Sequence, residues 1–108
     1  MRGDYEGWLR EQQYDQGTIA NQLHRVRKVE EAYGSLDDLV RSGMIDDTID
    51  QLRYSTSDER KNRPNPSKIA FQGNIRKNLQ SYKSAVVLYR RFASGQGEAD
   101  EDVPAVEA

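Results

Sequence analysis

The chain has 108 residues, of which 35% are hydrophobic and 31% charged, and its formal net charge is −2. This length accommodates one domain and excludes a multi-domain enzyme with its own cofactor-binding domain. The sequence contains no cysteine, which excludes a disulfide scaffold, a cysteine-ligated zinc site and a thiol nucleophile. No run approaches the roughly 20 apolar residues that span a bilayer, and residues 1–10 lack the apolar centre of a signal peptide, so we expect a soluble cytoplasmic protein.

Apolar spacing predicts two helices in the first third of the chain. A short helix over about residues 4–13 is predicted by side chains at positions i, i+3 and i+4, which are Tyr5, Trp8 and Leu9. A longer helix is predicted from Thr18, as its N-cap, to Tyr33, with Gly34 as the residue that stops it. Its apolar stripe contains Ile19, Leu23, Val26 and Tyr33.

Two short helices and a long loop are predicted next. Ser35 is a favourable N-cap for one helix, and Asp46 and Asp47 favour the start of another, because acidic side chains interact well with the amino-terminal end of the helix dipole. Residues 54–73 contain two prolines close together and are predicted to form a long loop with one helical turn at about residues 57–61.

The last helix has the clearest pattern, because apolar and aromatic side chains recur at steps of four and three from Ile75 to Ala93. Residues 95–108 contain five acidic residues and no basic one, and they are predicted to be a disordered tail or the start of a linker. The predicted fold class is therefore all-α. Residues 1–94 are predicted to form a compact bundle of four to five short helices with a long basic loop, and residues 95–108 are predicted to form a disordered acidic tail.

Charge is strongly segregated along the chain. Residues 1–52 contain 6 Lys/Arg and 11 Asp/Glu, whereas residues 53–91 contain 10 Lys/Arg and 2 Asp/Glu, a local net charge of +8. Such asymmetry is typical of proteins that bind polyanions. The alternative is that these cations solvate helix faces and pair with nearby acids.

Polar and basic side chains lie opposite the apolar stripe of the helix that ends at Tyr33. Asn, His, Arg and Lys at such positions can reach base edges or neutralise phosphates of duplex DNA. On this helix the candidate DNA-binding residues are Asn21, His24, Arg25 and Lys28. The loop and the last helix add cations that would hold phosphates, namely Lys61, Arg63, Lys68, Arg76 and Lys77.

No pattern in the chain indicates catalysis or metal binding. His24 is the single histidine, and without cysteine it predicts no transition-metal site. The acidic pairs lack the alternating ligands and the central glycine of a calcium loop, and the glycines form neither a phosphate loop nor a dinucleotide fingerprint. We therefore expect no enzyme activity, no cofactor, no metal and no small-molecule substrate.

Several motifs resemble one known domain. They are Tyr5, Trp8 and Leu9; Thr18 and Ile19; Leu23, Val26 and Arg27; Tyr33 and Gly34; and Leu36–Leu39; together with the last helix, NLQSYKSAVVLYRRFAS. In this order they resemble the N-terminal, SAM-like core-binding domain of tyrosine recombinases (phage integrase family). The resemblance implies a four-helix bundle that clamps duplex DNA, with Thr18, Asn21, Arg25 and Lys28 facing the duplex. The recombinase catalytic residues belong to a further domain, which this chain is expected to lack, and the loop at 54–73 is not part of the family's pattern.

The sequence therefore predicts a non-catalytic helical domain that binds double-stranded DNA. It would be part of, or related to, a protein of DNA recombination, integration or other DNA processing. The alternative is a small helical protein-interaction module, which self-associates or docks on a partner protein without binding DNA. In that case the acidic first half and the basic second half would provide the docking surfaces.

Overall fold

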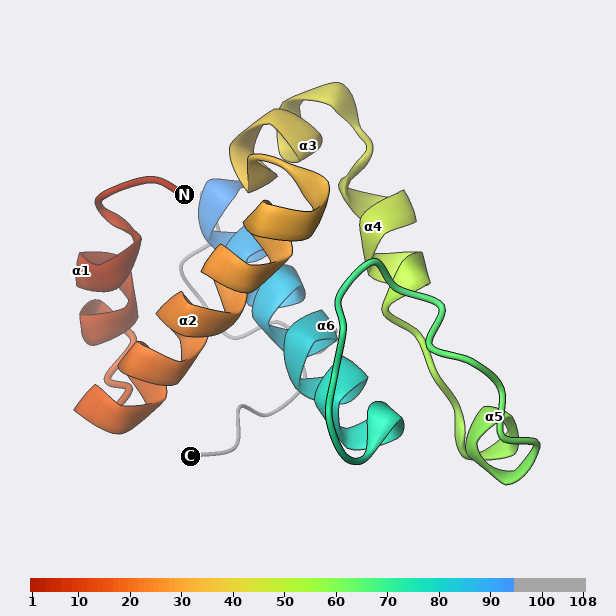
Figure 1. The fold of residues 1–108 in the computed structure, drawn as a ribbon. Coiled ribbons are helices and arrows are strands. Elements are labelled where there is room, and N and C mark those ends of the chain that lie inside the picture. The colour runs from red at the N-terminus through yellow and green to blue at the C-terminus, as the bar shows by residue number, and fades with distance from the viewer. Residues whose placement is uncertain (95–108) are drawn as a thin grey trace.

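The computed structural model describes residues 1–94, which form six helices and no strand (Figure 1). The prediction of an all-α fold is confirmed. The predicted disorder of residues 95–108 lies outside the described residues. The helices are α1 (Tyr5–Glu11), α2 (Gln16–Tyr33), α3 (Leu36–Ser42), α4 (Ile45–Gln51), α5 (Thr56–Arg60) and α6 (Ile75–Ala93). Within the described residues, none of these helices is both long and apolar enough to cross a membrane.

The last helix, α6, is the centre of the fold. It packs against each of the other five helices, most extensively against α2, and α2 and α4 lie on either side of it (Figure 1). Its stripe of residues at steps of four and three faces the interior, where Leu79, Val86 and Tyr89 are fully buried. The aromatic side chains of α1 and α6 meet beside this stripe, with the rings of Tyr5 and Tyr89 4.7 Å apart in an edge-to-face arrangement.

Helix α2 begins three residues earlier than the sequence predicts. Its N-cap is Asp15, whose Oδ1 accepts a hydrogen bond from the backbone N–H of Thr18 at 2.7 Å. This hydrogen bond holds the pKa of Asp15 below its usual range. The predicted Thr18 cap is therefore wrong, because a better acceptor three residues upstream satisfies the same N–H and leaves Thr18 within the first turn. The predicted stop at Gly34 is confirmed by its φ of 93°.

The short helices start where the sequence predicts. Ser35 caps α3, and the left-handed Gly43 ends it at φ 79°. The helical turn predicted at about residues 57–61 is α5, which begins with a capping box between Ser55 and Asp58.

The segment between α5 and α6 packs over the bundle. Ile69 is buried, and the ring of Phe71 lies 5.2 Å from the ring of Tyr82 on α6. The backbone N–H of Lys68 donates to the hydroxyl of Tyr33, which in turn donates to Oε1 of Gln51. The loop is thereby joined to the ends of both α2 and α4.

Candidate nucleic-acid interface

The outward face of α2 carries exposed polar side chains. Val26 and Val29 are fully buried on the inner side of the helix, whereas Asn21, His24 and Lys28 are exposed on the outer side. Within residues 1–94, none of these three takes part in an ion pair or in a side-chain hydrogen bond. Their donors and acceptors face solvent and are free to meet a ligand.

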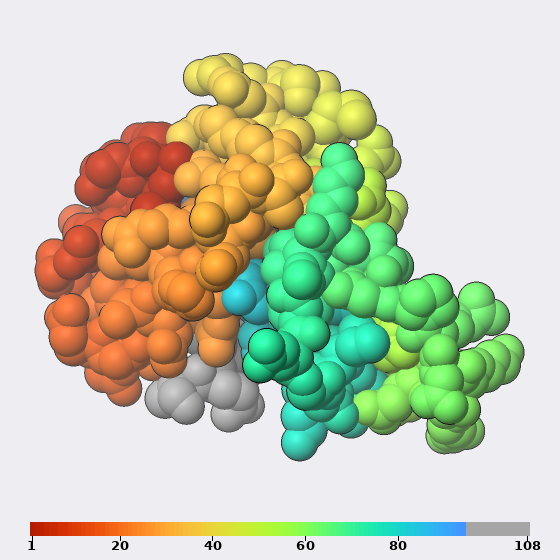
Figure 2. All heavy atoms as spheres, viewed as in Figure 1, coloured from red at the N-terminus to blue at the C-terminus, as the bar shows by residue number. Residues whose placement is uncertain are grey.

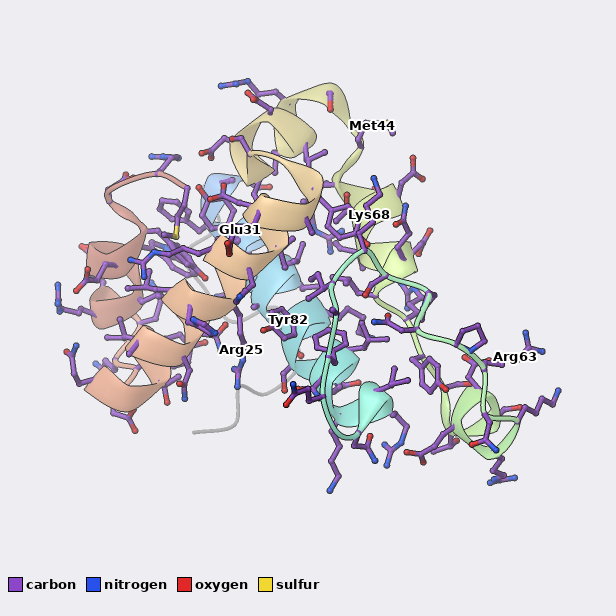
Figure 3. All side chains as sticks on the ribbon, in the orientation of Figure 1. Arg25, Glu31, Met44, Arg63, Lys68 and Tyr82 are labelled. Carbon is purple, nitrogen blue, oxygen red and sulfur yellow. The ribbon has the colours of Figure 1, made fainter. Side chains whose placement is uncertain are left out.

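Arg25 differs from the other predicted residues of α2 because it is half-buried in the seam between α2 and α6. Figure 3 shows Arg25 and Glu31 on α2, with Tyr82 of α6 between α2 and the loop. The pKa of the Tyr82 hydroxyl is raised, mainly by burial. The positive charge of Arg25 opposes this shift, and the negative charge of Glu31 adds to it. Arg25 therefore lies at the edge of the outer face, beside an aromatic side chain.

Thr18 does not reach this surface. Only 4% of it is exposed, because it lies in the first turn of α2 on the side that faces the core. Its predicted position on the duplex depended on the resemblance to the recombinase domain. In this fold its hydroxyl is not available to a macromolecular ligand.

Two of the predicted cations already have carboxylate partners in the described part of the chain. Nε of Arg63 lies 3.2 Å from Oδ1 of Asp58, and Nε of Arg76 lies 3.1 Å from Oε1 of Glu59. The side-chain hydrogen bonds from Arg76 and Asn74 hold the pKa of Glu59 below its usual range. For these two arginines, pairing with nearby acids is the observed arrangement.

The three predicted lysines outside α2 are exposed. Lys61 and Lys77 take part in no ion pair among residues 1–94, and the ammonium group of Lys68 lies 5.2 Å from the ring centroid of Tyr33. Arg63 lies at the α5 end of the molecule, well away from Arg25 on α2 (Figure 3). Most of the predicted residues therefore form two separate groups, one on α2 and another around α5 and the start of α6, whereas Lys68 lies on the loop beside Tyr33 at the end of α2.

Between these groups, the face shown in Figure 2 is hollowed between α2 and the loop, and atoms of α6 are visible at its base. Phe71 of the loop and Tyr82 of α6 are both half-buried and pack on each other. The two groups of cations are thus carried by separate ridges of the surface.

Sequence reasoning missed a second basic feature, a hollow between α4 and α6. It has a volume of about 390 Å³ and is lined by Asp46, Ile49, Asp50, Arg53, Lys83, Val87 and Arg90. A faint signal was present, because Lys83, Val87 and Arg90 recur at steps of four and three along α6, off its apolar stripe. Nothing in the sequence indicated that α4 would face them.

No family model matches this chain, and neither the curated proteins nor the solved structures contain a significant match. Within residues 1–94 there is also no group of three or more histidine, aspartate or glutamate side chains arranged to hold a metal ion.

Proposed function

We propose that this chain is a non-catalytic helical domain that binds double-stranded DNA through the outward face of α2. The observation that carries the proposal is the set of exposed side chains on this face without intramolecular partners, Asn21, His24 and Lys28. Side chains of these types donate to base edges and phosphates. An α-helix held by its opposite face to a bundle fits the width of the DNA major groove.

The predicted cations differ in whether they already have a carboxylate partner, and this difference determines how well each can bind a phosphate. Lys28, Lys61 and Lys77 have no carboxylate partner, whereas the charges of Arg63 and Arg76 are already partly neutralised by Asp58 and Glu59. A cation beside a carboxylate attracts a phosphate less strongly than an unpaired one. We therefore assign the main contacts to α2 and secondary phosphate contacts to Lys61 and Lys77.

The protein-interaction alternative has less support. Among the described residues, Met44 is the one large hydrophobic side chain that is strongly exposed, at 49% (Figure 3). The centre of a protein-docking surface is usually apolar and contiguous. The resemblance to the recombinase core-binding domain also favours DNA, and a role in recombination or integration is its natural extension.

The proposal is tested by fluorescence anisotropy with a short labelled duplex over a range of salt concentrations. Each phosphate contact contributes about 0.9 to the slope of log affinity against log salt. Lys28→Gln is expected to weaken binding and to reduce this slope by about one. Arg41→Gln is the matched control, because Arg41 is an exposed cation on α3 that pairs with Asp38.

Two outcomes would contradict the proposal. One is an affinity that does not change with salt or is absent at low salt, and the other is an equal loss in Lys28→Gln and Arg41→Gln. If DNA binding is absent and light scattering shows a salt-dependent dimer, the protein-interaction function replaces the DNA-binding one.

A further inference from the structure

Two adjoining hollows lie along α6 on the side that faces α4 and the segment after it. The first is the hollow of about 390 Å³ described above, and the second, of about 340 Å³, is lined by Leu52, Arg53, Tyr54, Ser55, Gln80 and Lys83. Arg53 and Lys83 line both hollows. These two cations therefore mark the point where the hollows meet.

The carboxylates of the first hollow are already neutralised. Nη1 of Arg90 lies 2.6 Å from Oδ1 of Asp46, and Nε of Arg53 lies 2.9 Å from Oδ1 of Asp50. Lys83 is half-buried and takes part in no ion pair among residues 1–94. With three cations and two carboxylates in its lining, the hollow has a net positive charge, and the ammonium group of Lys83 is its source.

The lining also suits a tetrahedral anion. A guanidinium group has five N–H donors, and each hydrogen bond that Arg53 and Arg90 make to a carboxylate uses only one of them. The apolar side of the hollow contains Ile49 and Val87, which are 4% and 7% exposed. A nearby apolar surface strengthens the attraction between an anion and these cations because it displaces water.

We propose that Lys83 and Arg53 bind a phosphate group in the hollow between α4 and α6. Phosphate is favoured over a carboxylate because three cations surround the hollow, and a phosphate can accept from an arginine fork and a lysine at once. The hollow is separated from α2 by α6 (Figure 1). The inference therefore stands apart from the proposed contact between α2 and DNA.

A phosphate group has two plausible sources, free phosphate or a mononucleotide, and the backbone of a nucleic acid. The test is a titration of the ¹⁵N-labelled full chain with inorganic phosphate, adenosine monophosphate and a short duplex, each at constant ionic strength, followed by ¹H–¹⁵N spectra. Saturable shifts centred on the amides around Arg53 and Lys83 are expected. Saturation by inorganic phosphate or the mononucleotide identifies a free ligand, whereas saturation by the duplex alone identifies the backbone.

Lys83→Gln is expected to weaken binding of the saturating probe about tenfold, which corresponds to about 1.4 kcal/mol. Arg41→Gln is the matched control, because it removes a positive charge from an exposed position on α3 that lines neither hollow and is not among the proposed DNA contacts. Since Lys83 has no ion pair to lose, its variant is expected to keep the melting temperature of the unmodified protein. Arg53→Gln provides a second, independent variant.

The inference is overturned if none of the probes gives saturable shifts in this region, or if Arg41→Gln weakens the binding as much as Lys83→Gln. It is also overturned if sodium acetate at the same ionic strength saturates the same amides equally well. Failure here is distinguishable from failure of the proposed function, because Lys28→Gln alters contacts of α2 and leaves these hollows unchanged.

Discussion

The hydroxyl of Tyr89 donates a hydrogen bond to Oδ1 of Asp37 at 2.9 Å, across 52 positions of sequence. The same hydroxyl accepts from the backbone N–H of Arg2 at 2.8 Å. Burial raises the pKa of Tyr89 far above its usual range, the N–H of Arg2 opposes this shift, and the Asp37 carboxylate adds to it. One side chain of α6 thereby joins the start of the chain to the first turn of α3.

Removing this hydroxyl is expected to destabilise the fold. Tyr89→Phe leaves the carboxylate of Asp37 and the N–H of Arg2 without their partner, so the free energy of unfolding should fall by about 1–3 kcal/mol. Urea denaturation of the two proteins measures this difference in the free energy of unfolding. Tyr82→Phe is the control on the same helix, since the hydroxyl of Tyr82 makes no hydrogen bond within residues 1–94. Equal losses in the two variants would refute the assigned role of Tyr89.

Alkaline pH is expected to unfold the protein through its buried tyrosines. Burial raises the pKa of Tyr5 as well as that of Tyr89. A tyrosine in the unfolded chain ionises near pH 10, whereas these two stay neutral in the fold. Their contribution to stability is therefore constant below about pH 10 and falls above it, by up to about 1.4 kcal/mol per pH unit for each tyrosine. Unfolding curves at pH 8 to 11 should show a smaller decline for Tyr89→Phe. An unchanged decline in that variant would contradict the prediction.

Glu30 is expected to matter far more than its neighbour Glu31. Oε2 of Glu30 accepts from the amino-terminal ammonium group of Met1 at 2.7 Å and from the N–H of Leu36 at 3.0 Å. Glu30→Gln removes the charge that both donors share, and about 1–2 kcal/mol of stability should be lost. Glu31 is exposed and makes neither kind of contact among residues 1–94. Glu31→Gln, measured in the same denaturation experiment, should therefore be close to neutral.

The capping box of α5 predicts a local effect. Ser55 Oγ accepts from the N–H of Asp58 at 3.1 Å, and the Asp58 carboxylate accepts from the N–H of Ser55 at 2.9 Å. Ser55→Ala should speed amide hydrogen exchange in α5 about fivefold, as expected for the loss of one N-cap. Ser57→Ala, a change of the same size within α5, serves as the control and should leave exchange unchanged.

The same box makes α5 sensitive to acid. The hydrogen bond from the backbone of Ser55 holds the pKa of Asp58 below its usual range. Stability from such a group is present above the ordinary pKa near 4 and is lost as the pH falls below it. Protection of the α5 amides should therefore decrease at low pH. In Asp58→Asn it should be low throughout and should change less with pH, the remaining change being due to Glu59, whose pKa is also lowered.

The predicted helices depend on features that the sequence displays locally. The steps of four and three from Ile75 to Ala93 depend only on helical geometry, and Gly34 has the positive φ that its predicted role as a helix stop requires. The predicted start of α2 was wrong because aspartate and threonine are both favourable N-cap residues. In the fold, it is the carboxylate of Asp15 that accepts from a free N–H group of the first turn, that of Thr18.

The candidate site was less accessible to prediction, because it depends on distant contacts. Lys28 was correctly placed at the surface, since its position follows from the apolar face of the same helix. The pairing of Arg76 with Glu59 requires α5 to lie beside α6, and the burial of Arg91, which is 6% exposed, requires the ring of Trp8 beside it. Periodicity along one helix contains no information about such neighbours.

The central position of α6 has a consequence for the order of events during synthesis. Every other helix of residues 1–94 packs against it, yet it is the last of these six helices to be synthesised. Helices α1 to α5 thus have no common partner until residues 75–93 have emerged, and a short helix without tertiary contacts is marginal in water. Folding is therefore expected to wait until α6 has emerged from the ribosome, and a nascent chain halted before Ile75 should remain protease-sensitive, which pulse proteolysis of stalled chains can show.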